Sequence, residues 1–126
     1  MPSKSKIKGN TFERELVNDA KQYELSAKRS WGSDGRSMGM HEEVDLVVES
    51  WSIQAKRRKS VAKWILPNEN VDAQCIRGDG GKAFIIMRYD DWCAEMHHRK
   101  ELLATIRRLS KENESWLIKT KLLIKK

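Results

Sequence analysis

The sequence has few cysteines, few prolines and no long apolar run. Its 126 residues contain two cysteines, Cys75 and Cys93, which form no CxxC pair. This spacing excludes a disulfide framework and a zinc ribbon and fits a reducing compartment. No apolar stretch approaches the roughly 20 residues that span a bilayer, and residues 1–8 lack the apolar segment of a secretory signal. We therefore expect one cytoplasmic domain rather than a membrane protein or a secreted scaffold.

Positive charge exceeds negative charge. The chain carries 25 Lys and Arg against 18 Asp and Glu, a formal net charge of +7. Apolar residues make up 39% of the sequence, which is too many for a disordered chain of this polarity. A net positive charge on so small a domain favours an anionic partner, most commonly nucleic acid, although a surface tuned for solubility gives the same balance.

The hydrophobic pattern predicts helices separated by short strands. Helices are predicted over residues 10–24, 68–76 and 90–113, the first and third from apolar residues that recur at helical spacing. In the first of these helices, Asn10 and Glu13 resemble a capping box. Pro67 suits the first turn of the second helix. Residues 116–124 fit a helix and a strand equally well.

Strands are predicted over residues 27–31, 43–50, 51–58 and 82–88. Side chains of the second and third alternate between two faces, and the last contains a short apolar run. The second and third of these strands follow each other closely enough to form a hairpin. Residues 32–40 contain three glycines, so this segment is expected to be a loop that is either mobile or folded around another group. The order of elements implies an α/β domain with a mixed central sheet flanked by helices.

The expected hairpin gathers polar residues that suit metal-assisted hydrolysis. Because side chains alternate along a strand, Asp45 shares one side of the hairpin with Gln54 and Lys56, while the other side stays apolar. Glu13 on the first helix adds a second carboxylate. Carboxylate and amide oxygens suit Mg²⁺, and a neighbouring lysine can orient water or stabilise charge on a phosphate. Taken singly, each residue also fits a surface position, but the combination favours phosphodiester cleavage.

Four segments carry a resemblance to a known family. They are Lys8–Val17 (KGNTFERELV), Arg29–Ser33 (RSWGS), Val44–Val47 (VDLV) and Ile53–Lys56 (IQAK). In this order and at these intervals, they resemble the archaeal-type Holliday junction resolvases. These are compact homodimeric members of the PD-(D/E)xK nuclease superfamily, with many relatives in phages and viruses.

The resemblance implies a fold, a reaction and partners. It implies a restriction-endonuclease-like α/β fold with a C-terminal helical extension. The expected parts are a basic arm (residues 1–8), a nuclease core (9–92), and a C-terminal helix and tail (93–126) packed on the core or at a dimer interface. The expected cofactor is Mg²⁺, with Mn²⁺ able to substitute, and no small-molecule cofactor. The expected partners are branched DNA and a second copy of the chain, in the host cytoplasm if the protein is viral.

The resemblance also implies roles for individual residues. Glu13, Asp45 and Gln54 match the metal-binding positions, and these three together with Lys56 match the catalytic set. The positions that match or continue the DNA contacts of the family are Arg14, Arg29, Ser33, Arg57, Arg58 and Lys59. The family has a Glu where this chain has Gln54, and a neutral amide is a poorer Mg²⁺ ligand than a carboxylate.

Two alternatives stay open beside a junction-resolving endonuclease. The first is a nuclease of the same superfamily that cuts ordinary duplex DNA, as Mrr or restriction enzymes do, and Gln54 favours it. The second is a DNA-binding module that kept the fold without cleaving. The basic run 56–59 would contact phosphates in each case, although a charge run is also typical of a solvated face.

Overall fold

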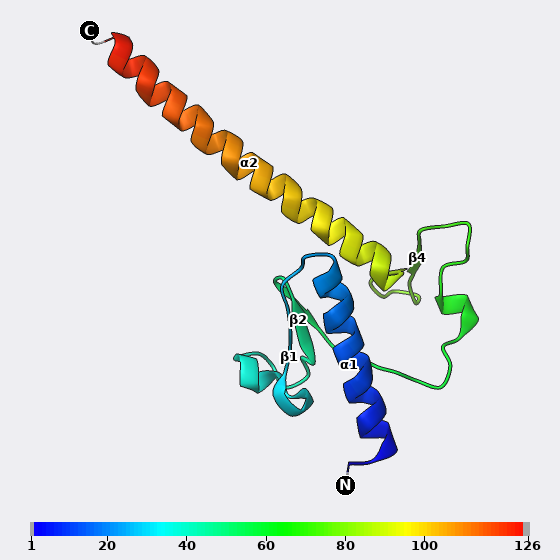
Figure 1. The fold of residues 1–126 in the computed structure, drawn as a ribbon. Coiled ribbons are helices and arrows are strands. Elements are labelled where there is room, and N and C mark those ends of the chain that lie inside the picture. Colours follow the sequence, from blue (N-terminus) through cyan, green and yellow to red (C-terminus); the bar gives the residue numbers. More distant parts are fainter. Residues whose placement is uncertain (1, 125–126) are drawn as a thin grey trace. The chain divides into compact units, whose positions relative to one another are not determined.

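The computed structural model describes residues 2–124, apart from the side chain of Ser33, and has two compact units, Met1–Ala94 and Glu95–Lys126 (Figure 1). It is a mixed α/β protein with two small antiparallel sheets. In chain order, the helices, strands and 3₁₀ turns (η) are α1 (Lys4–Gln22), β1 (Ala27–Arg29), η1 (Trp31–Ser33), η2 (Gly35–Met38), β2 (Leu46–Val48), β3 (Trp51–Ile53), η3 (Lys63–Ile65), β4 (Ala73–Ile76), β5 (Phe84–Met87) and α2 (Tyr89–Ile124).

Helix α1 begins six residues before the predicted start at Asn10. Ser3 is the N-cap, and its hydroxyl accepts a hydrogen bond from the Lys6 N–H at 3.2 Å. The predicted capping box at Asn10 is therefore wrong, and most of the expected basic arm is helical. The first turn carries lysines rather than acidic residues, which is unfavourable for the helix dipole. For this reason the sequence does not predict a helix start at Lys4.

The first sheet has the order β1–β2–β3, and all its strands are antiparallel. In β2, Leu46 and Val48 are 0% exposed, whereas Val47 between them is partly exposed. The predicted alternation and hairpin are thus confirmed, with Leu46 opposite Ile53. The strands are shorter than predicted, because the backbone leaves regular geometry at both ends of the hairpin. Asp45 precedes β2, and Gln54 follows β3.

The glycine-containing loop folds into two 3₁₀ turns, η1 and η2. Gly32 and Gly39 have positive φ angles of 58° and 71°, which residues with a Cβ rarely adopt. Met40 N–H donates back to the Gly35 carbonyl at 2.9 Å, which closes the second turn. The loop is therefore ordered by its own hydrogen bonds.

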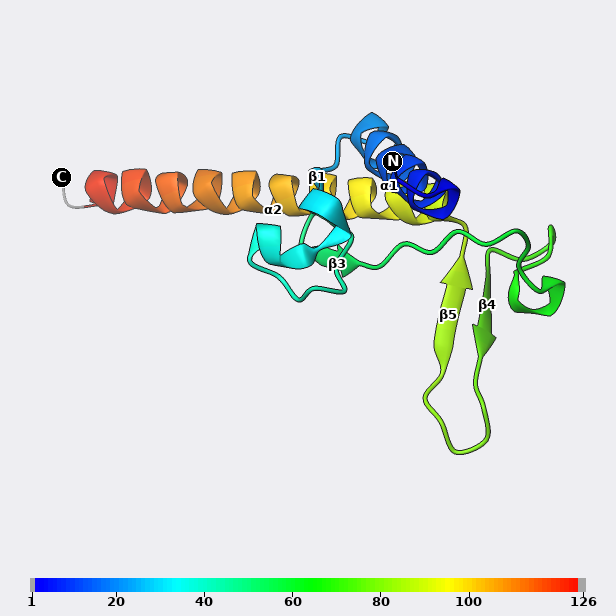
Figure 2. The same cartoon turned by 90° about the horizontal axis from the view of Figure 1, so that it is seen from below.

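The second sheet pairs β4 with β5 (Figure 2). The prediction of β5 is confirmed, but the predicted helix over Asn68–Ile76 is wrong, since Ala73–Ile76 forms β4. Asn68 instead starts a turn in which its side-chain oxygen accepts from the Asn70 N–H at 2.8 Å. The described strands thus form two separate antiparallel sheets rather than the one mixed sheet that the sequence predicts.

Helix α2 continues through the predicted 90–113 segment to Ile124, so the undecided tail is helical up to that residue. Its first turns belong to the first unit. There the Tyr89 hydroxyl donates to the Leu16 carbonyl at 2.7 Å, and Trp92 packs between Tyr89 and Trp51. Among residues 2–124, no helix combines the length and the apolar character needed to cross a membrane.

Two glycines of the first unit should respond in opposite ways to alanine. At Gly9, inside α1, an added Cβ meets nothing within 4 Å, so Gly9→Ala should raise the free energy of unfolding by about 0.5–1 kcal/mol. At Gly35, the same Cβ would overlap the His41 carbonyl oxygen, so Gly35→Ala should lower it by about 1–3 kcal/mol. Urea unfolding measures both changes. Equal effects of the two variants would contradict this account of the loop.

Candidate functional site

A buried ion pair joins α1 to the first sheet. Glu13 lies on the buried face of α1 and is 4% exposed. Arg29 on β1 donates to its Oε2 atom through Nε at 3.2 Å and through Nη2 at 3.0 Å. The same Nη2 reaches Asn10 Oδ1 at 3.3 Å. Because Asn10 and Glu13 are three residues apart on one helix, a single guanidinium contacts both.

Asp45 is held at the open end of the hairpin, one residue before β2. It is 9% exposed, and its Oδ2 accepts a hydrogen bond from the Ala55 N–H at 2.7 Å. Its own N–H donates to the Ile53 carbonyl at 2.9 Å. Its carbonyl accepts from the N–H and the hydroxyl of the buried Ser30 at 2.9 and 3.0 Å. The backbone of Asp45 is therefore held by both adjacent chain segments, and its carboxylate by the segment that follows β3.

The electrostatic surroundings of Asp45 bring three of the predicted residues together. Burial raises the pKa of the Asp45 carboxyl above its ordinary value, and the hydrogen bond from Ala55 opposes this change. The negative charge of Glu13 raises this pKa further, whereas the positive charge of Lys56 lowers it. Glu13 and Lys56 thus each lie close enough to Asp45 to influence its carboxyl group.

The donor set fits a hard divalent cation. Two buried carboxylates repel each other, as the effect of Glu13 on the pKa of Asp45 indicates, and a cation between them would offset that repulsion. Oxygen ligands of this kind suit Mg²⁺. Gln54, the expected third ligand, directly follows Ile53, the last paired residue of β3, and its side chain is exposed.

The basic residues after β3 line a cavity of about 400 Å³. We call it the basic cavity. Its lining residues come from the start of α1 and from the segment after β3, and they are Ser5, Lys8, Gly9, Ala55, Lys56, Arg57, Arg58 and Lys59. The cavity thus carries five cationic side chains and no acidic one, which favours a phosphate-bearing ligand.

Two other predicted DNA contacts, Arg14 and Ser33, are not among the described side chains that line the basic cavity. Arg14 is exposed on α1, next to Glu13 in sequence. The side chain of Ser33 lies outside the described part of the chain. Trp31 in the adjacent loop is 85% exposed and presents a large aromatic surface. Trp92, in contrast, is partly buried and packs on the rings of Tyr89 and Trp51.

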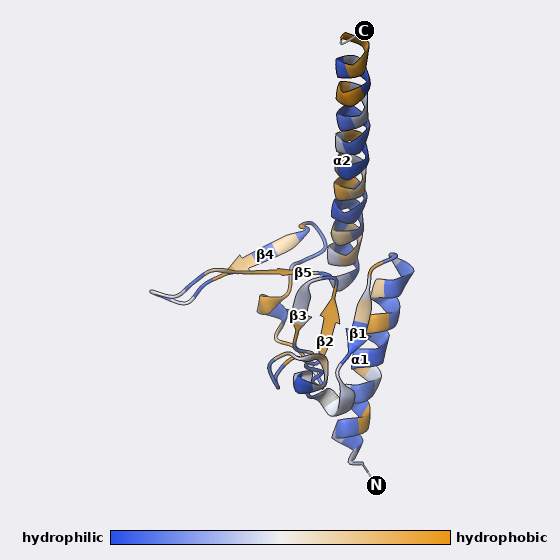
Figure 3. Cartoon of the chain, turned by 90° about the vertical axis from the view of Figure 1, so that its left-hand side faces the viewer, coloured by the Kyte–Doolittle hydropathy of each residue, from blue (hydrophilic) through white to orange (hydrophobic). Residues whose placement is uncertain are grey.

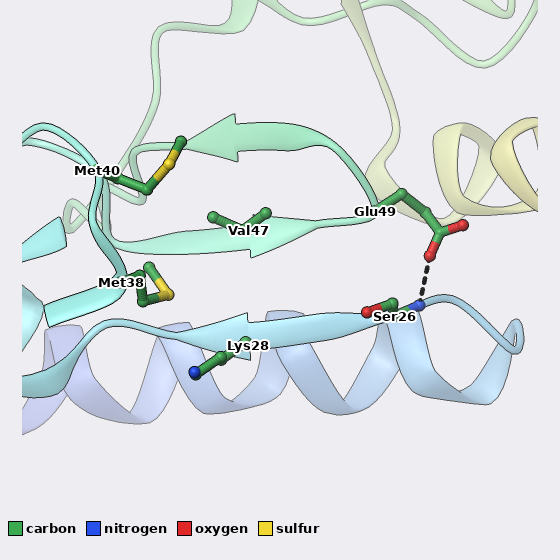
Figure 4. Close-up of a pocket in the computed structure, with 6 residues that line it drawn as sticks. All are labelled: Ser26, Lys28, Met38, Met40, Val47 and Glu49. Carbon is green, nitrogen blue, oxygen red and sulfur yellow. Dashed lines mark hydrogen bonds between the residues drawn. The ribbon is translucent and has the colours of Figure 1, made fainter.

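A second cavity, of about 270 Å³, lies on the opposite face of the first sheet (Figure 4). Met38 and Met40 of the 32–40 loop line one end of this cavity, Ser26 and Glu49 line the other end, and Val47 and Lys28 lie between them. Glu49 is engaged there, since its carboxylate accepts from the Ser26 N–H at 2.7 Å. None of the predicted site residues lines this cavity.

Sequence reasoning missed three contributors to the candidate site. Asn10 was assigned to a helix cap, although its spacing of three from Glu13 was a usable signal. Lys8 lines the basic cavity because α1 starts early. Ser30, which anchors Asp45 through its hydroxyl, gave no signal in the sequence.

Comparisons of the chain with protein-family models, with curated proteins and with solved structures gave no match.

Proposed function

We propose that this protein is a Mg²⁺-dependent DNA endonuclease. One observation carries the proposal. The charges of both Glu13 and Lys56 act on the buried Asp45 carboxylate, and Lys56 also lines a cavity with five cationic side chains. Two carboxylates, a lysine and a phosphate-binding surface are the parts that metal-assisted phosphodiester hydrolysis requires. The order of the sequence motifs points to the PD-(D/E)xK superfamily and its restriction-endonuclease-like fold.

Each residue has a distinct role in this proposal. Glu13, Asp45 and the Gln54 carbonyl would hold the cation, which when bound polarises the phosphate and lowers the pKa of water. The Ala55 N–H keeps the Asp45 carboxylate in one orientation. Arg29 does the same for Glu13.

The remaining residues act on the DNA. The ammonium group of Lys56 would orient the attacking water and stabilise charge on the phosphate. The flanking residues of the basic cavity, Arg57, Arg58 and Lys59, would hold the backbone, together with Arg14 on α1. Trp31 offers a surface on which an unpaired base would stack.

Within this class, we propose a junction-resolving enzyme that acts as a homodimer. A two-fold symmetric dimer presents two sites to opposite strands of a four-way junction, which suits paired nicks. Gln54 is the observation that favours a second candidate, a nuclease for ordinary duplex DNA, since the resolvase family has Glu there.

The test is cleavage of a labelled four-way junction and a matched linear duplex, with Mg²⁺ or with EDTA. We expect paired nicks in the junction alone, and their loss with EDTA. Lys56→Gln should lower the cleavage rate at least about 100-fold. Lys28→Gln is the matched control, because Lys28 is an exposed lysine on the opposite face of the same sheet.

Each other outcome has a defined meaning. Equal cutting of both substrates would replace the resolvase by the duplex nuclease. Tight junction binding without cleavage, with both Mg²⁺ and Mn²⁺, would overturn the enzyme and leave a DNA-binding module. Equal losses in the Lys56 and Lys28 variants would remove Lys56 from the active site.

A further inference from the structure

The part of α2 in the second unit contains many hydrophobic residues (Figure 3). Their side chains are largely exposed. Five of them recur at intervals of three, four or seven residues along the helix, and these are Leu102, Ile106, Leu109, Trp116 and Leu123. Each is at least half exposed. Other exposed apolar residues, among them Ile118 and Leu122, lie beside this stripe, and an exposed apolar surface of this extent marks a contact site.

The spacing of these residues is that of a coiled coil. From Leu102 to Leu123, steps of four and three residues alternate without a break when Asn113 and Thr120 are included. In heptad terms, Ile106, Asn113 and Thr120 then take position a, and Leu102, Leu109, Trp116 and Leu123 take position d. This seam covers about three heptads. Three of its four d positions are Leu and one a position is Ile, and Ile at a with Leu at d favours a parallel two-stranded arrangement.

Asn113 identifies the partner. It lies at position a in the middle of the seam, whose other polar residue is Thr120, also at position a. Opposite an apolar partner its amide would be buried without hydrogen bonds, which is costly. Opposite itself, in a parallel and in-register pair, one amide donates to the carbonyl of the other. A single Asn at position a is also the feature that fixes the register and the two-stranded state.

The flanking positions are compatible with the same arrangement. In a parallel in-register pair, residues at position g face residues at position e of the partner, five positions later. Glu112 would face Leu117 of the partner subunit, and Lys119 would face Ile124 of the partner subunit. No like charges meet in these contacts, and the aliphatic e residues widen the buried stripe.

We propose that residues 102–124 bind a second copy of this chain as a parallel, in-register two-stranded coiled coil. The proposal supplies the dimer surface that the proposed function requires, but its argument uses α2 alone. It is therefore tested without DNA and without any measurement of cleavage.

The test is sedimentation equilibrium of the full chain at concentrations from about 1 to 100 µM, which are the concentrations where a short coiled coil dissociates. We expect a mass twice that of one chain. Ile106→Glu should raise the dissociation constant at least about 100-fold, because it buries a charge in the seam. Ile118→Glu is the matched control: Ile118 is 60% exposed, close to the 57% of Ile106, but lies at position f, outside the seam.

A cross-linking experiment tests the orientation, and it does so independently of the stability of any charged variant. In a Cys75→Ser background, Leu109→Cys should form an intersubunit disulfide on mild oxidation, because equivalent d positions face each other only in a parallel pair. Ile118→Cys in the same background should not.

Two results would overturn the proposal: a wild-type chain that stays monomeric at 100 µM, or equal cross-linking at both positions. A monomer that still cleaves DNA would refute the coiled coil and leave the nuclease intact. A dimer that fails to cleave DNA would refute the nuclease and leave the coiled coil intact.

Discussion

Asp45→Asn is expected to abolish metal-dependent cleavage while making the folded protein more stable. The loss follows from the proposed function, because a neutral amide replaces the central metal ligand, and we expect a decrease of at least about 1,000-fold in rate. The gain in stability follows from burial, which raises the pKa of Asp45 and so penalises its charged form. Asparagine keeps an oxygen that accepts the hydrogen bond from Ala55. A gain of about 0.5–2 kcal/mol is typical of such sites.

The change in stability on Asp45→Asn should depend on pH, which identifies burial of the charged carboxylate as its cause. The ordinary pKa of an aspartate is 3.8, and in the folded state the pKa of Asp45 lies above this value. The folded protein therefore binds the Asp45 proton more tightly than the unfolded chain does. The contribution of Asp45 to stability is therefore most favourable below the ordinary pKa, and it falls as the pH rises through the raised value. The advantage of Asp45→Asn over the wild type should grow in the same direction.

Urea unfolding at several pH values measures this advantage, and Glu42→Gln is the matched control at an exposed acid of the neighbouring loop. An Asp45→Asn variant that cleaves normally would remove Asp45 from the active site. One that is less stable than the wild type at neutral pH would show that the hydrogen bond, rather than burial, dominates at Asp45.

Arg29→Ala is expected to destabilise the fold more than any other single charge removal that we consider. The substitution removes a guanidinium that donates two hydrogen bonds to a carboxylate with 4% exposure. Removing one member of a buried ion pair costs about 3–5 kcal/mol, since the remaining charge keeps its desolvation penalty. We expect a matching decrease in the free energy of unfolding, measured in urea.

Two further variants test the cause. Glu13→Gln in the Arg29→Ala background should recover part of the loss, because it removes the buried charge. Arg36→Ala should leave the unfolding midpoint unchanged, although Arg36 also forms an ion pair, since its partner Asp34 lies in an exposed loop. Equal effects of Arg29→Ala and Arg36→Ala would contradict the assignment of a buried, structurally required pair.

The sequence predicted those elements whose pattern is local and regular. The hairpin of β2 and β3, the strand β5 and the body of both helices follow from alternation or from helical spacing, and the structure has them. The sequence-based prediction was wrong where the local residue pattern conflicts with strand pairing. The residues after Pro67 read as a helix, but Ala73–Ile76 gains a hydrogen-bonding partner in β5, and the pairing decides its conformation.

For the candidate site, the sequence by itself determined which residue types are present and in what order, and strand alternation put Asp45 on the polar side of the hairpin. Only the tertiary structure decided their environment. It joined Glu13 to Arg29, directed the Asp45 carboxylate to the Ala55 N–H, and left Gln54 exposed. These contacts depend on where the backbone leaves regular strand geometry at both ends of the hairpin. The period of a strand contains no information about that point, so only the packed chain determines it.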